Sequence, residues 1–280
     1  MQRKRETLVV VRGGGDIATG TIQKLWNSGF GLVVLETDRP TAIRRKVALS
    51  QAVYEGTATV EDLTAARIES TDEIEKEWEK GRIPLLVDPD GRSIEVLKPD
   101  VVVDAIIAKK NLGTYKEMAP LVIGIGPGFV AGKDVHLVVE SMRGHNLARI
   151  LETGSALANT GIPGNIGGYT KERVIHAAAE GYMKNLHQIG DVVRKGEKIA
   201  RIYEQMSPEG VFSGRFVSVE ATIPGVLRGL IREGYHFQKG FKIADIDPRE
   251  SELANCFTIS DKASSIGGSV LEAVCRYVNG

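Results

Sequence analysis

The sequence predicts an α/β protein in which a Rossmann-like parallel sheet is followed by a small β domain. Two observations predict this fold class. Residues 8–38 have the pattern of a strand, a glycine turn, a helix and a second strand. After residue 190 the pattern changes to short strands and glycine turns, and one segment occurs twice. We expect an α/β domain over residues 1–185, a β domain over 186–250, and a C-terminal helix over 251–280 that packs back on the α/β domain.

The first strand and helix are predicted from apolar spacing and turn chemistry. Residues 8–11 are a short apolar run, which suits a strand that is buried on both faces. Three glycines, 13–15, allow a sharp turn there, and Asp16 can cap the helix that begins at that point. Residues 32–35 form the next apolar run, which ends in Glu36. A strand, a glycine turn, a helix and an acidic strand end are typical of dinucleotide binding.

This pattern predicts where a dinucleotide would bind. Its diphosphate would lie at the helix N-terminus, where unpaired N–H groups and the helix dipole favour negative charge. Glu36 would accept hydrogen bonds from a ribose diol, as in NAD binding, whereas Arg39 and its basic neighbours would suit the second phosphate of NADP. The sequence therefore does not distinguish between NAD and NADP. A glycine turn that binds no nucleotide is the alternative. The candidate cofactor-binding residues are Gly13, Gly14, Gly15, Asp16, Ile17, Ala18, Glu36, Arg39, Gly126, Pro127 and Gly128.

Further apolar runs predict strands over residues 84–87, 101–107, 121–125 and 136–139. Ligands collect beyond the carboxyl ends of strands in open α/β sheets. Lys109 follows one such strand and is a candidate anion contact, with a solvated lysine as the alternative. Arg143 and His145 follow another, in a glycine-rich stretch that continues to Gly168 through Pro163. Arg143 is a candidate phosphate or carboxylate clamp and His145 a candidate acid or base, with a structural histidine as the alternative.

The repeated segment aligns residues 190–202 with residues 234–246 without a gap. Glycine, lysine and apolar positions are identical, for example Gly196 with Gly240 and Lys198 with Lys242. The unit resembles the half-motif of biotinyl and lipoyl carrier domains, the barrel-sandwich hybrid. Such carriers present a modifiable lysine between the two halves. Residues 219–226 contain no lysine, so we expect a static binding or docking module and not a covalent carrier.

Composition excludes several classes of protein. Lys plus Arg and Asp plus Glu are 36 each, so no global field attracts nucleic acid or an anionic membrane. We expect no transmembrane segment and no signal peptide at the basic start. Cys256 and Cys275 form no metal-ligand spacing, which predicts no metal site. The expected location is the cytoplasm, and a homo-oligomer remains open. Near the end of the chain, Asp261 can cap a helix with apolar residues at helical spacing.

The whole chain resembles the YqeB family, accessory proteins of selenium-dependent molybdenum hydroxylases. The resemblance covers GGGDIATG, IRRKVALSQAVYEG, IGIGPGFVAGKDVHLVVESMRGH, NTGIPG, GVLRGLI and SDKASSIGGSVLEAV. It implies a Rossmann domain related to that of the XdhC insertion factors and a maturation role for the molybdopterin cytosine dinucleotide cofactor. The implied partners are a molybdenum hydroxylase client or other maturation factors. No cysteine lies beside the glycine turn, which argues against sulfur or selenium transfer on this chain's own thiols.

Three functions therefore stay open at this point. The first is a maturation factor that binds a dinucleotide-type ligand, either NAD(P) or molybdopterin cytosine dinucleotide. The second is an NAD(P)-dependent oxidoreductase of small substrates with His145 or Lys109 near the nicotinamide. The third is a scaffold with an empty glycine turn, whose β domain only docks a partner. The sequence does not decide whether the chain is an enzyme.

Overall fold

A computed structural model describes residues 6–161 and 164–280. The basic start of the chain and Pro163, which the sequence assigned to the glycine-rich stretch, lie outside the described residues. The chain divides into two units. The first contains residues 1–40, 47–160 and 259–280, and the second contains residues 41–46 and 161–258. No helix in the described part of the chain combines the length and apolar character needed to cross a membrane.

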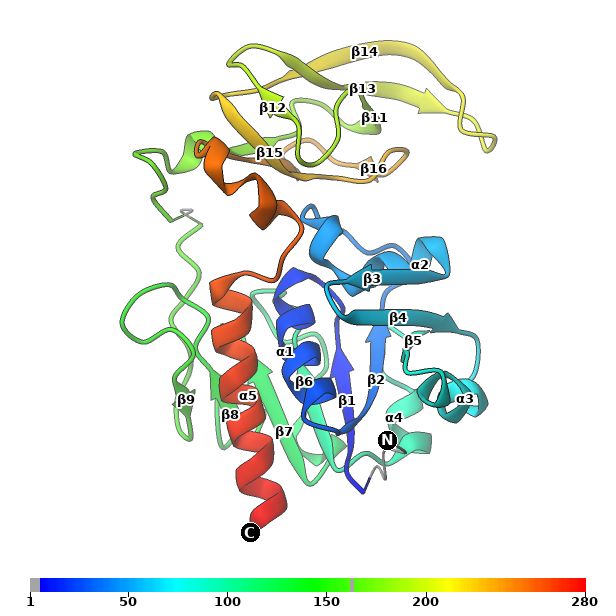
Figure 1. Cartoon of the computed structure of the whole chain (residues 1–280), viewed down its shortest axis with the longest axis vertical. Coiled ribbons are helices and arrows are strands. Elements are labelled where there is room, and N and C mark those ends of the chain that lie inside the picture. Colours follow the sequence, from blue (N-terminus) through cyan, green and yellow to red (C-terminus); the bar gives the residue numbers. More distant parts are fainter. Residues whose placement is uncertain (1–5, 162–163) are drawn as a thin grey trace. The chain divides into compact units, whose positions relative to one another are not determined.

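The first unit is built on a sheet of nine strands (Figure 1). In spatial order these are β3 (Thr57–Val60), β4 (Leu63–Ile68), β5 (Ile83–Val87), β2 (Gly31–Glu36), β1 (Leu8–Arg12), β6 (Val101–Asp104), β7 (Leu121–Ile125), β8 (Leu137–Val139) and β9 (Ile150–Leu151). The strands from β4 to β8 are parallel, whereas β3 and β9 run antiparallel to their neighbours at the two edges.

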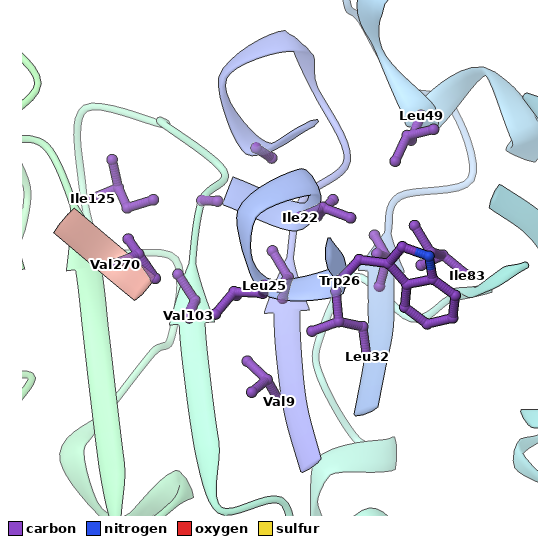
Figure 2. Close-up of a cluster of buried hydrophobic side chains, with 14 of the residues drawn as sticks. Val9, Ile22, Leu25, Trp26, Leu32, Leu49, Ile83, Val103, Ile125 and Val270 are labelled. Carbon is purple, nitrogen blue, oxygen red and sulfur yellow. The ribbon is translucent and has the colours of Figure 1, made fainter. Parts of the chain in front are cut away.

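Helices cover both faces of this sheet because its central strands are apolar on both sides. Val9 and Val11 belong to one buried cluster, and Val10 between them belongs to another. α1 (Asp16–Asn27) and α5 (Asp261–Asn279) pack on the first face, side by side in Figure 1. Figure 2 shows Ile22, Leu25 and Trp26 of α1 and Val270 of α5 in that cluster. The other helices of this unit are α2 (Ala52–Glu55), α3 (Ile74–Glu79) and α4 (Ser93–Leu97).

The second unit consists of two antiparallel sheets of four strands each. One sheet has the order β10 (Val174–His176), β17 (Lys242–Asp247), β15 (Gly225–Leu230) and β12 (Val192–Val193). The other has the order β14 (Phe212–Glu220), β13 (Lys198–Met206), β11 (Gly181–Asn185) and β16 (His236–Phe237). A single buried cluster contains residues of both sheets, including Val226 and Ile246 from one and Met183 and Ile202 from the other.

The sequence repeat is confirmed as one local unit used twice. Each copy contains a two-residue strand, a glycine in the left-handed region and a longer strand. The glycines are Gly196, with φ of 81°, and Gly240, with φ of 86°. Positive φ is strained for other residues, which explains why both copies keep glycine there.

The fold class predicted from the sequence is wrong. The sequence predicted a Rossmann-like parallel sheet and a barrel-sandwich hybrid. The structure has a mixed nine-stranded sheet and two four-stranded antiparallel sheets. The hairpin of β3 and β4 makes one edge of the large sheet antiparallel, and β9 does the same at the other edge. The predicted strand over residues 101–107 ends at Asp104, because Ile107 has a φ of 60°, which a strand does not tolerate.

Candidate functional site

The glycine turn after β1 is a close contact between three segments of the first unit. Gly13 has a φ of 98° and donates its N–H to the carbonyl of Leu35, at 2.7 Å. A Cβ at this position would lie 3.0 Å from the carbonyl oxygen of Ala105, in the loop after β6. Both the backbone conformation and the lack of space therefore require glycine at residue 13.

Glu36, at the end of β2, stabilises this turn through hydrogen bonds. Its carboxylate accepts the N–H of Gly14 and the N–H of Thr37, both at 2.8 Å. Burial raises the pKa of Glu36, and the two backbone N–H groups oppose that rise by stabilising the charged form. The role predicted for Glu36, binding a ribose, stays a prediction, since each of its oxygens already accepts a hydrogen bond from the protein.

A segment near α2 covers one side of the same turn. Ser50 donates its N–H to the carbonyl of Gly14 at 2.8 Å, and Leu49 donates to the hydroxyl of Thr19 at 3.2 Å. Ser50 is 1% exposed, and its hydroxyl oxygen has no hydrogen-bond partner within the described residues. A buried hydroxyl without a partner is uncommon and indicates a place for a water molecule or a ligand group.

The other side of the turn is open at Gly15. A Cβ there would meet no atom within 4 Å, and Gly15 has an ordinary φ of −66°. Gly15 is the N-cap of α1, so the prediction that Asp16 caps this helix is corrected: Asp16 is its first residue. Ile17 packs against the core and Ala18 is fully buried. Gly15 and Asp16 are thus the part of the turn that a ligand can approach.

The start of α5 lies near the start of α1. Arg143, in the loop after β8, donates to both carboxylate oxygens of Asp261, at 2.8 and 3.0 Å. The pKa of Lys262, the next residue of α5, is lowered by burial and then by the positive charge of Arg143. The carboxylates of Asp16, Glu140 and Asp261 act in the opposite direction on this lysine. The charged groups near the two helix N-termini are thus the cations Arg143 and Lys262 and the carboxylates of Asp16, Glu140 and Asp261. They lie at the carboxyl end of the parallel strands.

Lys262 was missed in the sequence because nothing local distinguishes it from a solvated lysine at a helix start. Its position depends on the packing of α5 beside α1. The N-cap of α5 is Ser260, whose hydroxyl accepts the N–H of Ala263 at 3.2 Å, which corrects the prediction that Asp261 caps this helix. Asp261 pairs with Arg143 instead.

The second predicted glycine turn lies on the far side of the loop after β6. A Cβ on Gly128 would lie 2.8 Å from the Cα of Lys110, and a Cβ on Gly126 would lie 2.6 Å from the hydroxyl oxygen of Ser141. Gly126 and Gly128 thus leave no room for a side chain against the neighbouring loops, and Pro127 between them is half-buried. The Gly13 turn contacts the same β6 loop at Ala105. The structure therefore brings the two glycine turns to one edge of the sheet, separated by that loop.

The remaining candidates are exposed. Arg39 lies in the loop after β2, His145 in the loop after β8, and Lys109 in the loop after β6 with a φ of 64°. Within the described residues no group of three or more His, Cys, Asp or Glu side chains is arranged to hold a metal ion. A cavity of about 520 Å³ in the first unit is lined by Asp100 and Tyr115, among others. Asp100 precedes β6, so this cavity lies at the opposite end of that strand from the glycine turn.

Comparison with known proteins identifies one informative relative. The chain is 48% identical over 272 residues to "Uncharacterized protein YqeB" of Escherichia coli (strain K12), a match that covers 97% of the chain and 48% of the relative. The chain thus spans about half the length of the curated relative it matches. The resemblance to the YqeB family is supported by this identity. No protein-family model matches the chain.

Similar solved structures are more distant. The product-bound Ectoine utilization protein EutE (DoeB) from Ruegeria pomeroyi is 12% identical, with a TM-score of 0.27, over 86% of this chain and 85% of that chain. An aspartoacylase family protein from Mesorhizobium loti is 9% identical, with a TM-score of 0.29, over 88% and 86%. These values are too low to assign a shared fold or a shared function.

Proposed function

We propose, from the resemblance of the sequence to the YqeB family described above, that this chain is an accessory factor in the maturation of selenium-dependent molybdenum hydroxylases. It binds a phosphate-bearing, dinucleotide-type ligand at the carboxyl end of the parallel strands of the first unit. The observation that carries the proposal is the open space at Gly15, at the N-terminus of a twelve-residue helix. Main-chain N–H groups and the helix dipole favour an anion at such a place.

Two further features support a phosphate at Gly15. The buried hydroxyl of Ser50, in the segment that contacts Gly14, has no hydrogen-bond partner among the described residues, so a ligand oxygen that reached it would satisfy it. The Lys262 ammonium, partly buried near Asp16, supplies positive charge. The carboxylates of Asp16 and Glu140 oppose an anion, which makes Lys262 the residue on which binding depends most.

These residues fit the diphosphate of either ligand considered. Molybdopterin cytosine dinucleotide would bring the molybdenum cofactor of the client enzyme. The chain's own residues would bind and orient it: Gly15 through the main chain, Ser50 through its hydroxyl and Lys262 through its charge. For an NAD(P)-dependent oxidoreductase, the alternative function, the same diphosphate contacts would apply. His145 and Lys109 would then have to approach a nicotinamide from exposed loops.

The test is thermal unfolding of the full chain with pyrophosphate, CTP, NAD or NADP. A ligand at a hundred times its Kd stabilises the folded chain by about 2.7 kcal/mol, which raises the Tm by several degrees. We expect the shift with pyrophosphate and CTP. A shift with NAD or NADP alone would favour the oxidoreductase, and no shift with any of the four would contradict the proposal.

Variants locate the binding site. Gly15→Leu places a side chain in the open space, and Lys262→Gln removes the charge; both are expected to abolish the ligand-induced shift. Gly268→Leu is the matched control, because Gly268 of α5 also has negative φ and open space around its Cβ position. It should retain the shift. A shift that survives in Gly15→Leu would place the ligand elsewhere.

A further inference from the structure

The second unit presents a row of aromatic rings across one sheet. His236 of β16 is opposite Tyr182 of β11, Tyr182 is opposite Tyr203 of β13, and Tyr203 is opposite Phe216 of β14. The ring centroids of His236 and Tyr182 are 4.6 Å apart, and those of Tyr203 and Phe216 are 5.2 Å apart. Four strands thus each contribute one ring to the same line.

This row lies on the face of the sheet opposite to the core. Side chains alternate between the faces of a strand, and the neighbours of the row, Met183, Ile202 and Phe237, are buried in the core of the unit. Phe216 is 46% exposed, although β14 is an outer strand of its sheet. Proteins usually protect such edges with charge or short strands, so an exposed aromatic ring there indicates a contact surface.

A second row on the same face carries positive charge. Lys184 is opposite Arg201, which is opposite Ser218, each two residues from a ring of the first row. The guanidinium of Arg201 lies 4.6 Å from the ring centroid of Phe216. Lys184 pairs with Glu233 at 2.8 Å, whereas Arg201 has no carboxylate within ion-pair distance in the part of the chain described.

The kind of partner follows from these charges. Glu180 lies 3.5 Å from His236 at one end of the aromatic row, and Glu233 neutralises Lys184 beside it. Arg201 is therefore one isolated positive charge on this face, and not the continuous positive surface that the phosphates of a nucleic acid require. Aromatic residues, Met and Arg are the residue types enriched in the centre of protein interfaces. A hollow of about 360 Å³ lies beside Tyr182 and Met206, and its other lining residues are the polar Glu204, Gln205, Ser207 and Ser213.

We propose that this face docks a partner protein through a segment that places apolar side chains on the aromatic row and a carboxylate on Arg201. The site is separate from the ligand site of the first unit, and it does not depend on what binds there. Among the described residues Arg201 has the Tyr203 hydroxyl, at 3.5 Å, as a hydrogen-bond partner but no carboxylate. The partner's carboxylate supplies that counter-charge, and a charge-assisted hydrogen bond to a planar guanidinium adds specificity.

The experiment uses a random-peptide display library selected on the full chain. We expect the enriched peptides to combine apolar residues with Asp or Glu. A synthetic peptide with the enriched sequence should bind Phe216→Ser and Arg201→Gln about tenfold or more weakly than the unchanged protein. Val192→Ser is the matched control: Val192 is 48% exposed on the other sheet, and its variant should bind normally.

A charge exchange tests the pairing directly. The Arg201→Glu variant should no longer bind the enriched peptide. It should bind a second peptide in which Lys replaces the acidic residue. The proposal is overturned by failure of that exchange, by no enrichment, or by enrichment of basic peptides. Binding of oligothymidylate that depends on Phe216 would identify a nucleic-acid surface instead. Self-association abolished by Phe216→Ser would identify a contact between copies of this chain, and would also overturn it. Circular dichroism checks that each variant is folded.

Discussion

Gly20 of α1 and Gly267 of α5 are in backbone contact: a Cβ on Gly267 would lie 2.5 Å from the carbonyl oxygen of Gly20. A Cβ on Gly20 would in turn lie 2.5 Å from the carbonyl oxygen of Ala263. The two helices approach this closely only because neither has a side chain at the crossing. The contact places Lys262 near the start of α1, and with it the charge available to the proposed ligand site.

Gly267→Ala should destabilise the chain, because the added methyl group must push the two helices apart. We expect a loss of about 1–3 kcal/mol in the free energy of unfolding, measured by urea titration. The adjacent Gly268 has open space, so Gly268→Ala should stabilise the chain by up to about 1 kcal/mol through helix propensity. Equal effects of the two substitutions would show that the close helix contact does not exist.

Glu36→Gln should destabilise the glycine turn. A glutamine has one acceptor oxygen, so its amide group would face the N–H of either Gly14 or Thr37 and leave that donor without a partner. An unsatisfied buried donor costs about 1–3 kcal/mol. Thr37→Ala, which keeps both backbone N–H groups, is the control and should cost much less. An unchanged urea midpoint for Glu36→Gln would contradict the bracing role of the carboxylate.

His136 should make stability fall in mild acid. Burial, followed by the charge of Lys116, lowers the pKa of His136 below its ordinary value of 6.5, and its Nδ1 accepts the N–H of Val122 at 2.9 Å. As the pH falls through 6.5, the unfolded chain takes up the proton first, so stability declines until the lowered pKa is passed. His136→Gln should have a smaller decline over that window in urea unfolding.

The control for this pH dependence is His145→Gln, which removes an exposed loop histidine. An effect that His136→Gln and His145→Gln share would come from replacing any histidine and is subtracted. If His136→Gln and the unchanged chain had the same curve below pH 6.5, His136 would not be the group that titrates.

The second unit contains a buried ion pair that should be sensitive to removal of one partner. Arg173 is 4% exposed and donates to Asp245 at 3.3 Å, and also to the carbonyl of Ile246 at 3.2 Å. Arg173→Met would leave the Asp245 carboxylate buried without its counter-charge, at a cost of about 3–5 kcal/mol. The double variant with Asp245→Leu should recover most of this loss. A double variant no more stable than Arg173→Met would show that the pairing is not the cause.

Local elements were largely predictable, whereas their assembly was not. The strand at residues 8–11, the helix from residue 16 and the repeat after residue 190 follow from apolar spacing and glycine turns, and the structure confirms them. The hairpin of β3 and β4 was missed because its turn contains Glu61 at a φ of 52° in place of glycine or asparagine. That hairpin is one reason why the prediction of a parallel sheet failed.

The sequence by itself determined where the chain turns and which residues alternate between core and solvent, because both depend on neighbours a few positions apart. Only the tertiary structure decided which strands pair, that Glu36 holds Gly14, and that Lys262 lies near Asp16. Every strand edge presents the same backbone donors and acceptors, so pairing is chosen by which apolar faces fit together across the whole chain. The packing of α5 on α1 brings Lys262, which is near the end of the sequence, close to the start of the first helix.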